Sequence, residues 1–329
     1  MQTPGFINRK AALDVKIRNF GEDLWCYSPS LLTYSIDQHK PKDGFRFLPI
    51  SITGQKCQLQ CDHCRGQILK SMFPAETPDS LEALINNFAQ KNTEGILISG
   101  GSLLNGSVPL ISFIPTLKKI KEQYDLSLVI HTGLVTQDLA MGLAEVGVDA
   151  VMLDIIGDNE TITNVCHLLK TINDFELSLK MLERYNIPTV PHVIVGLNYG
   201  KLAGELKAVD IIAKHPLKAL VVVALMPLEN TPMEAVAPPR PDNISSVITY
   251  SRMTFPKTPI ILGCARPRGI HKISTDISAI KSGVNGIAFI SQEGANYAKK
   301  RGYRLRFSDH CCSLIFKDIK LLETAESVW

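Results

Sequence analysis

Eight short apolar runs recur along the chain, and each is followed by a segment whose apolar residues return with the period of a helix. The runs are rich in Val, Ile and Leu and are apolar at almost every position. Uninterrupted runs of this kind are typical of strands that are buried on both faces of a parallel sheet. We therefore predict strands, alternating with helices, at residues 45–53, 95–100, 127–133, 150–157, 189–196, 219–227, 259–267 and 286–291.

The alternation of strands and helices is compatible with a closed barrel and with an open doubly wound sheet. Eight repeats favour the barrel, and 329 residues suit one such domain with additions at its ends. We predict an α/β fold of the (β/α)8 TIM type over residues 45–291. An N-terminal extension, 1–44, and a C-terminal tail, 292–329, are expected to cover the mouth of the barrel.

Polar side chains stand at or near the ends of the predicted strands. Ser99, His131, Asp154, His192 and Cys264 all occur where an apolar run gives way to a loop. Any one of them is explained equally well as a helix cap or as a partner for loop amides. Because the carboxyl ends of barrel strands face the same side, their common placement predicts a functional site there.

Composition and charge exclude several classes of protein. The chain is 45% hydrophobic and 20% charged, and its net charge of +3 comes from mixed signs. It has no basic block of the kind that tracks phosphates. No apolar run reaches the roughly 20 residues that span a bilayer, and residues 1–12 lack the pattern of a signal peptide. We expect a globular, cytoplasmic protein that binds neither nucleic acid nor membrane.

Eight cysteines in a cytoplasmic chain indicate metal binding or catalysis rather than disulfides, because that compartment keeps thiols reduced. Cys57, Cys61 and Cys64 form a C-x3-C-x2-C pattern directly after the first predicted strand. Three thiolates hold three corners of a 4Fe-4S cluster and leave its fourth iron open. A structural zinc site wants four ligands. His63 lies between two of the cysteines, where the backbone can hardly bring it to the same metal.

The cysteine loop, with His63 before its last cysteine, resembles the cluster loop of radical S-adenosylmethionine (SAM) enzymes. That resemblance implies a 4Fe-4S cluster on Cys57, Cys61 and Cys64 whose open iron chelates the amino and carboxylate groups of SAM. It also implies reductive cleavage of SAM to a 5'-deoxyadenosyl radical, which abstracts a hydrogen atom from an unactivated carbon.

Two further segments resemble SAM-binding segments of this family. The segment "ISGGS", with Ser99, Gly100 and Gly101, resembles the glycine pair that hydrogen-bonds the SAM amino group through its backbone. Only glycine lets a main chain approach a ligand so closely. The family's acidic residue after the pair is Ser102 here, so that contact is not implied. The segment "VIVGLNYG", which contains Gly196, resembles the one that contacts adenine. Candidates for contacts with ribose or substrate are His131, Asp154 and His192.

Five cysteines remain outside the cysteine loop. Cys166 lies in a helical pattern and is interpreted as a small buried side chain. Cys264 ends the seventh predicted strand beside two arginines, Cys311 and Cys312 are a tandem pair in the tail, and Cys26 belongs to the N-terminal extension. We predict a second 4Fe-4S cluster held by Cys26, Cys264 and one or both of the tail cysteines. Its ligands would tie both termini to the barrel.

A second cluster next to a radical-generating one indicates a source of sulfur, because a substrate carbon radical can attack a bridging sulfide. Residues 25–298 resemble biotin-synthase-like radical SAM proteins, most of all the branch that contains the two-component, archaeal-type lipoyl synthases. The resemblance implies sulfur insertion into an unactivated C–H bond of a protein-bound octanoyl or mercapto-octanoyl chain, as one step of lipoyl formation. In biotin synthase the second cluster has two irons and an arginine ligand, and Arg266 or Arg268 keeps that alternative open.

Such a reaction implies three partners: a lipoyl carrier protein or its octanoylated lysine peptide, a second radical SAM protein, and a ferredoxin or flavodoxin as electron donor. Two alternatives stay open. One is a biotin-synthase-like or other radical SAM enzyme with a single 4Fe-4S cluster and no sulfur transfer. The other is a non-catalytic scaffold that binds an iron-sulfur cluster or zinc and a partner.

Overall fold

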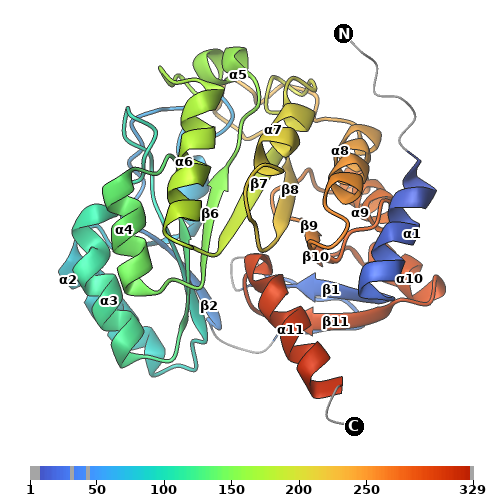
Figure 1. Cartoon of the computed structure of the whole chain (residues 1–329), viewed down its shortest axis with the longest axis horizontal. Helices are drawn as coiled ribbons and strands as arrows, with labels where there is room; N and C mark the ends of the chain where they lie inside the picture. The colour runs from blue at the N-terminus through green and yellow to red at the C-terminus, as the bar shows by residue number, and fades with distance from the viewer. Residues whose placement is uncertain (1–7, 30–32, 42–44, 327–329) are drawn as a thin grey trace.

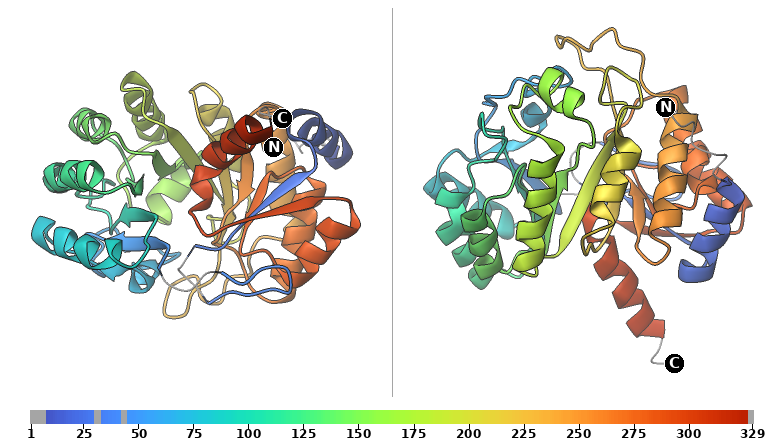
Figure 2. Two further views of the ribbon diagram at one scale, coloured as in Figure 1. Left: turned by 90° about the horizontal axis from the view of Figure 1, so that it is seen from below. Right: turned by 45° about the horizontal axis from the view of Figure 1, so that its top comes forward.

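Eleven strands form one parallel sheet in the part of the chain that the computed structural model describes, residues 8–29, 33–41 and 45–326. Their order is β11-β1-β10-β9-β8-β7-β6-β5-β4-β2-β3, and the sheet curls into a half-barrel (Figures 1 and 2). The eight predicted strands are all present, as β2 and β4 to β10. The bounds are β1 (Asp23–Tyr27), β2 (Phe47–Ser51), β3 (Phe73–Pro74), β4 (Gly95–Ser99), β5 (Ser127–His131), β6 (Ala150–Asp154), β7 (Thr189–Val195), β8 (Leu220–Ala224), β9 (Ile260–Leu262), β10 (Gly286–Ala288) and β11 (Arg304–Ser308).

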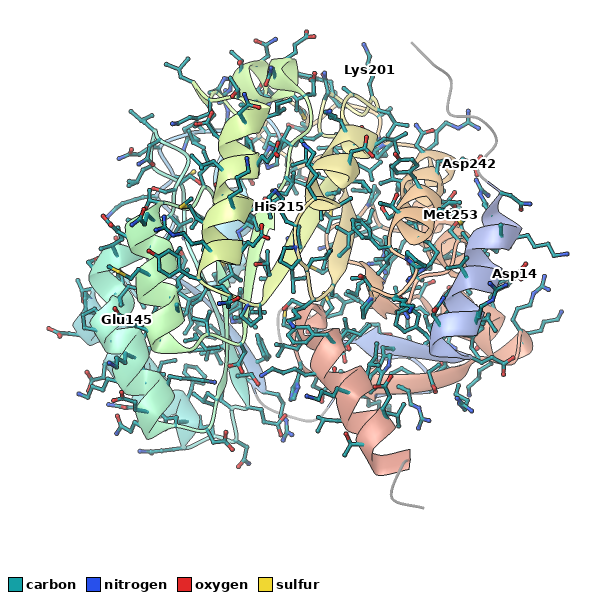
Figure 3. All side chains as sticks on the ribbon, in the orientation of Figure 1. Asp14, Glu145, Lys201, His215, Asp242 and Met253 are labelled. Atoms are coloured by element: carbon teal, nitrogen blue, oxygen red, sulfur yellow. The ribbon has the colours of Figure 1, made fainter. Side chains whose placement is uncertain are left out.

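Helices cover the outer face of the sheet (Figure 2). Thr77 and Thr136 cap two of them by accepting hydrogen bonds from first-turn amides. Side chains fill the space between sheet and helices, whereas Asp14, Glu145 and Asp242 lie on exposed helix faces (Figure 3). The helices are α1 (Arg9–Phe20), α2 (Pro78–Ala89), α3 (Ile114–Gln123), α4 (Gln137–Val146), α5 (Asn159–Asn164), α6 (Ile172–Arg184), α7 (Glu205–Ile212), α8 (Pro241–Thr254), α9 (Ile270–Lys281), α10 (Gln292–Lys300) and α11 (Ile315–Glu326), with 3-10 turns η1 (Gln67–Ser71), η2 (Ile111–Phe113) and η3 (Cys312–Leu314).

Alternate residues of each central strand enter two separate apolar layers. Leu128 and Ile130 of β5 pack in the layer that contains the helices, whereas Val129 between them faces the lumen of the half-barrel. In β6, Ala150 and Met152 face the lumen in the same way. Because both faces are buried, these strands are apolar at almost every position, and this pattern made them predictable.

β1 and β11 belong to the sheet, although we expected both segments to lie in extensions that cover the mouth. β1 pairs in parallel with β10 and β11, so that Cys26 lies opposite Ile287 and Phe307. β11 is an edge strand whose sequence, RLRFS, is charged at alternate positions and largely half-buried. An edge strand does not need an uninterrupted apolar run, so the pattern that identified the other strands did not identify this one.

The C-terminal tail enters the half-barrel at the amino-terminal ends of the strands, not at the mouth as we expected. Residues Cys312–Leu314 and the start of α11 pack in the lumen with Phe47 and Ala150, which begin their strands. Lys317 of α11 forms an ion pair with Asp149, directly before β6. α11 therefore closes the end of the lumen opposite the carboxyl ends of the strands (Figure 1).

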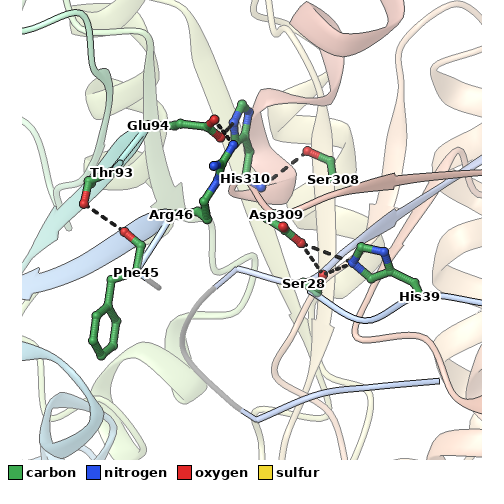
Figure 4. Close-up of polar contacts among 9 residues, drawn as sticks. All are labelled: Ser28, His39, Phe45, Arg46, Thr93, Glu94, Ser308, Asp309 and His310. Atoms are coloured by element: carbon green, nitrogen blue, oxygen red, sulfur yellow. Dashed lines mark hydrogen bonds and ion pairs between the residues drawn. The ribbon is translucent and has the colours of Figure 1, made fainter. Parts of the chain in front are cut away.

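Polar side chains connect the two sides of the half-barrel near β2 and β11 (Figure 4). His310, just after β11, contacts Glu94 at 2.9 Å, and Arg46 contacts the same carboxylate from the start of β2. The neighbouring Asp309 points the other way and contacts His39 at 3.2 Å. In the described part of the chain, β2 and β11 are therefore connected by side-chain contacts and not by backbone hydrogen bonds.

A buried ion pair holds the loop after β9. The side chains of Arg266 and Asp276 are 1% and 0% exposed, and their charged atoms lie 2.9 Å apart. The guanidinium also donates to the carbonyls of Gly263 and Phe289, at 2.7 and 3.2 Å, while Asp276 accepts from the amide of Ser291 at 2.7 Å. All three guanidinium nitrogens are therefore used within the fold, which makes Arg266 a structural residue.

Arg266→Met is expected to lower the free energy of unfolding by about 3–5 kcal/mol, because it leaves the carboxylate of Asp276 buried without its cation. Arg268→Met is the matched control, since Arg268 is exposed in the same loop, and should stay within about 0.5 kcal/mol of wild type. Urea denaturation followed by far-UV circular dichroism measures both. Equal stabilities of the two variants would show that the pair does not hold the loop.

Candidate active site

The cysteine loop lies at the carboxyl end of β2. Cys57, Cys61 and Cys64 are all free thiols; the last two are buried and Cys57 is half-buried. The thiol of Cys61 donates to the carbonyl of Cys166 at 3.5 Å, and that of Cys57 to the carbonyl of Ser102 at 3.8 Å. The loop therefore rests on the segments that follow α5 and β4.

Asp62, inside the cysteine loop, ties the loop to two other segments. Its carboxylate contacts His167 at 2.9 Å and accepts a hydrogen bond from the hydroxyl of Tyr199, and its amide donates to the carbonyl of Val165 at 2.9 Å. Burial by itself raises the pKa of Asp62, but the bonds from Tyr199 and His167 outweigh it and hold the pKa below its ordinary value. Sequence reasoning missed this anchor, because no local motif joins three partners so far apart in the chain.

The cysteine loop itself requires glycine at position 101. A Cβ there would lie 2.0 Å from the carbonyl oxygen of Lys56 and 2.6 Å from the Cα of Cys57. The Gly101 amide also donates to the hydroxyl of Thr53 at 2.7 Å. At Gly100 a Cβ would meet side-chain atoms, the nearest of them 3.1 Å away on Thr53. The end of β4 and the cysteine loop are thus in direct backbone contact at Gly101.

The three loop thiols fit a polynuclear cluster better than a single ion. Burial raises the pKa of Cys64 to about 12 against the opposing amide of Gly66, and the neighbouring thiols of Cys61 and Cys57 add to the increase. The three sulfurs are nevertheless not all within 4.8 Å of one another, whereas sulfurs on one zinc ion lie about 3.8 Å apart. The Nδ1 atom of His63 is buried without a hydrogen-bond partner among the described residues, and burial lowers the pKa of its imidazole.

Three of the remaining cysteines lie close enough for their charges to act on one another. Cys264 follows β9, while Cys311 and Cys312 lie where the tail enters the lumen. Desolvation, and then the neighbouring charge of Cys311, raise the pKa of Cys264, although Cys264 is exposed, and Cys264 in turn acts on the pKa of Cys312. The structure therefore brings together thiols from two segments that are far apart in the sequence.

The structure does not bring Cys26 to these three. Its thiol lies in the layer between sheet and helices, 3.8 Å from the carbonyl of Leu24 and close to the charge of Asp276. Its neighbours Trp25 and Tyr27 pack in the lumen instead. Side chains alternate between the two faces of a strand, so the register of β1 directs Cys26 away from the lumen.

Cys311 has the most ionisable thiol of this group. A hydrogen bond from the thiol of Cys312, and others from the hydroxyl and amide of Ser313, hold the pKa of Cys311 below its ordinary value, although burial acts in the opposite direction. The Ser313 hydroxyl lies 3.1 Å from the Cys311 sulfur. The nearby imidazole of His131 acts in the same direction as Ser313. Cys311 is therefore the thiol of the tail that most readily becomes a thiolate ligand.

Three of the polar side chains predicted at strand ends also meet in the lumen. His131 Nε2 lies 3.6 Å from Asp154 Oδ2, and His192 Nδ1 lies 3.7 Å from Asp154 Oδ1. Burial by itself raises the pKa of Asp154, but the two imidazoles outweigh it and lower the pKa. Ser99 is turned toward the backbone, where its hydroxyl donates to the carbonyl of His131 at 3.2 Å.

Gly196 follows β7 in the left-handed region, with φ +77°. Its amide donates to the buried carboxylate of Glu205 at 2.7 Å, and the amides of Ala203 and Gly204 bind the same carboxylate. Burial raises the pKa of Glu205, while these amides act in the opposite direction. The carboxylate thus fixes the turn between β7 and α7 beside a small cleft at the carboxyl ends of β6 and β7. Sequence reasoning did not single out Glu205.

Comparisons with known proteins agree with this architecture. Residues 51–201 match the family model of the Radical SAM superfamily. This part of the chain, a little under half of it, is similar to radical SAM proteins. A biotin synthase from Vesicomyosocius okutanii subsp. Calyptogena okutanii (strain HA) is 26% identical over 157 residues, which are 47% of this chain and 48% of that protein. The match therefore spans about half the length of that curated relative.

Several solved structures share the fold. Methylornithine synthase has a TM-score of 0.63 at 12% identity, over 97% of this chain and 93% of that chain. The FeFe-hydrogenase maturase from Carboxydothermus hydrogenoformans has a TM-score of 0.58 at 14% identity, over 90% of this chain and 70% of that chain. SuiB from Streptococcus suis, solved with S-adenosylmethionine, has a TM-score of 0.51 at 13% identity, over 69% of this chain and 51% of that chain.

The similarity of residues 51–201 to the Radical SAM superfamily model points to a 4Fe-4S cluster and SAM. Cys57, Cys61 and Cys64 are the residues that fit this cluster, by their number, their shared loop and the spread of their sulfurs. Among the described residues, no helix is both long enough and apolar enough to cross a bilayer.

Gly101→Ala is expected to destabilise the protein by at least the roughly 1–3 kcal/mol of an overpacked site, because the new methyl group meets the backbone of the cysteine loop. Iron and labile sulfide per chain should fall well below those of wild type. Gly100→Ala is the matched control, since its methyl group meets movable side-chain atoms. Elemental analysis after anaerobic reconstitution measures both variants. Similar iron contents in the two would contradict the backbone contact.

Alkylation is expected to be fastest at Cys311 in protein prepared without iron. The thiolate is the nucleophile and is present above the pKa, so a lowered pKa extends the reaction to lower pH. Ser313→Ala removes one stabilising hydrogen bond and should move the midpoint of the reaction to higher pH. Mass spectrometry of iodoacetamide-treated peptides gives the pH profile, with buried Cys64 as the internal reference. If the midpoint is the same in Ser313→Ala and in wild type, the Ser313 hydroxyl does not lower the pKa of Cys311.

Proposed function

We propose that this chain is a radical SAM enzyme that inserts sulfur into an unactivated C–H bond with the help of a second iron-sulfur cluster. The observation that carries the proposal is the proximity of the exposed Cys264 to Cys311 and Cys312, whose charges act on one another. Thiolates are the usual ligands of such clusters. The similarity to a biotin synthase, although it spans half of that protein, supports a reaction of the same class.

The residues of the chain place and protect the reacting groups. Cys57, Cys61 and Cys64 would hold the first cluster, and Asp62 fixes their loop through Tyr199. When bound, the first cluster with SAM supplies the radical that removes a hydrogen atom from the substrate, and the second cluster supplies the sulfur. The tail closes the lumen from the opposite end and so shields this region from water.

The second cluster would take Cys264, Cys311 and Cys312 as ligands. Cys26 is not included among the proposed ligands, although we expected it from the sequence, because its side chain faces the helices. Arg266 is occupied by Asp276 and two carbonyls, so it does not provide the arginine ligand of the two-iron alternative. The lowered pKa of Cys311 favours the deprotonated form that binds iron.

The substrate has to approach from the carboxyl ends of the strands. Deeper in the lumen, Val129, Met152 and Val221 are between 0% and 4% exposed and pack against the tail, so they form core and not an open channel. We propose a protein-bound octanoyl or mercapto-octanoyl lysine as the substrate, carried by a lipoyl carrier protein or its peptide. A second radical SAM protein and a ferredoxin or flavodoxin complete the proposed system.

The test counts clusters. Iron, labile sulfide and Mössbauer spectra are measured on reconstituted wild type, on a Cys57, Cys61 and Cys64 triple-alanine variant, and on the matching Cys264, Cys311 and Cys312 variant. Two four-iron clusters predict about eight irons in wild type and about four in either variant. Cys26→Ala is the control and should retain about eight irons. About four irons in wild type, falling to none without the loop cysteines, would identify an enzyme with a single cluster and no sulfur transfer.

Sulfur transfer is tested separately. Protein reconstituted with isotopically labelled sulfide is incubated with SAM, reductant and an octanoyl-lysine peptide, and the product is analysed by mass spectrometry. Labelled sulfur in the peptide is expected from wild type and not from the Cys264, Cys311 and Cys312 variant. SAM cleavage without labelled product would retain the radical SAM activity and refute sulfur insertion on this substrate.

A further inference from the structure

We propose that His131, Asp154 and His192 bind one divalent first-row transition-metal ion, at a site separate from the iron-sulfur clusters. The three residues belong to consecutive parallel strands, β5, β6 and β7, and the sheet register places Asp154 opposite His192. Donors on adjacent strands of a packed sheet are held more precisely than donors on loops. The inference does not depend on the proposed sulfur transfer.

The donor atoms lie close enough together for small shifts to place them around one ion. All three donors lie within 4.8 Å of one another. The two imidazole nitrogens approach separate oxygens of Asp154, at 3.6 and 3.7 Å. Charge-assisted hydrogen bonds are much shorter, about 2.7–2.9 Å. Two ligands on a tetrahedral ion with bonds of about 2.0–2.1 Å lie about 3.4 Å apart. The observed distances therefore suit an ion between the groups better than direct hydrogen bonds.

Among the described residues, Asp154 also lacks the lysine or arginine partner that Asp276 and Asp149 have. Asp276 pairs with Arg266, and Asp149 pairs with Lys121 and Lys317. In the described part of the chain Asp154 forms ion pairs with the two histidines and with no lysine or arginine. A divalent ion between the groups supplies positive charge to Asp154 while both imidazoles stay neutral, which is the form that coordinates metal.

The ligand set indicates the class of ion. Two imidazoles and one carboxylate suit iron, zinc or a similar transition ion, whereas magnesium and calcium prefer oxygen ligands alone. The side chains of His131, Asp154 and His192 are 24%, 36% and 14% exposed, so the site is open to the lumen. A set of three protein ligands leaves coordination positions for a carbonyl, carboxylate or thiolate of a bound molecule.

Cobalt(II) is the probe, because it replaces iron and zinc and is paramagnetic. The protein is reconstituted first, so that iron occupies the cluster cysteines, and is then dialysed against cobalt(II). We expect about one cobalt per chain, as a site with one set of three ligands allows. Its pulsed electron paramagnetic resonance spectrum should show modulation from imidazole nitrogen, and its absorption should lack sulfur-to-cobalt charge transfer.

His131→Gln, His192→Gln and Asp154→Asn should each weaken cobalt binding at least tenfold, since even the loss of an outer-shell partner weakens metal binding about 10–100-fold. His271→Gln is the control; His271 bonds the carbonyl of Pro239 outside the site and should leave binding unchanged. Wild-type affinity in the first three variants, or bound cobalt without nitrogen modulation, would overturn the proposal. The second readout uses wild type alone, so it decides the question even if a variant fails to fold.

Discussion

The backbone contact between Gly101 and the cysteine loop governs the geometry of the site. With no Cβ at this position, the carbonyl of Lys56 and the Cα of Cys57 pack directly on the end of β4. Because β4 is held in the parallel sheet, this contact restricts the motion of the loop. Asp62 adds a second attachment, to Tyr199 and to the segment after α5. Three thiols that would otherwise sit on a mobile surface loop are held at the carboxyl ends of the strands.

The lumen is closed at one end by the tail and open to ligands at the other. η3 and the start of α11 pack against side chains that begin the strands, which places Cys311 and Cys312 in the lumen. Cys264 meets them from the loop after β9, whose shape depends on the Arg266 and Asp276 pair. Folding of the tail and formation of the second thiol group are therefore the same event.

The enclosed carboxylates of this protein are stabilised by different kinds of hydrogen-bond donor. Asp276 has a guanidinium, Glu205 has backbone amides, and Asp62 has a hydroxyl and an imidazole. Each of these arrangements uses close hydrogen bonds and has a structural role. Asp154 differs, because its imidazole partners stand at 3.6 and 3.7 Å in a region that remains open to the lumen. The longer distances distinguish Asp154, which we propose as a metal ligand, from the three carboxylates that have structural roles.

Local patterns in the sequence identified the eight central strands, because strands that are buried on both faces are continuous apolar runs. The three cysteines of the loop were identified by their spacing of a few residues. Only the tertiary structure decided the rest. The side chain of Cys26 faces the helices because of the register of β1, the tail enters from the far end of the lumen, and Arg266 is used by the fold. These outcomes depend on which face of a strand a side chain occupies and on contacts between remote segments. Neither property is present in a linear pattern, since both arise only when the sheet curls and its two ends come together.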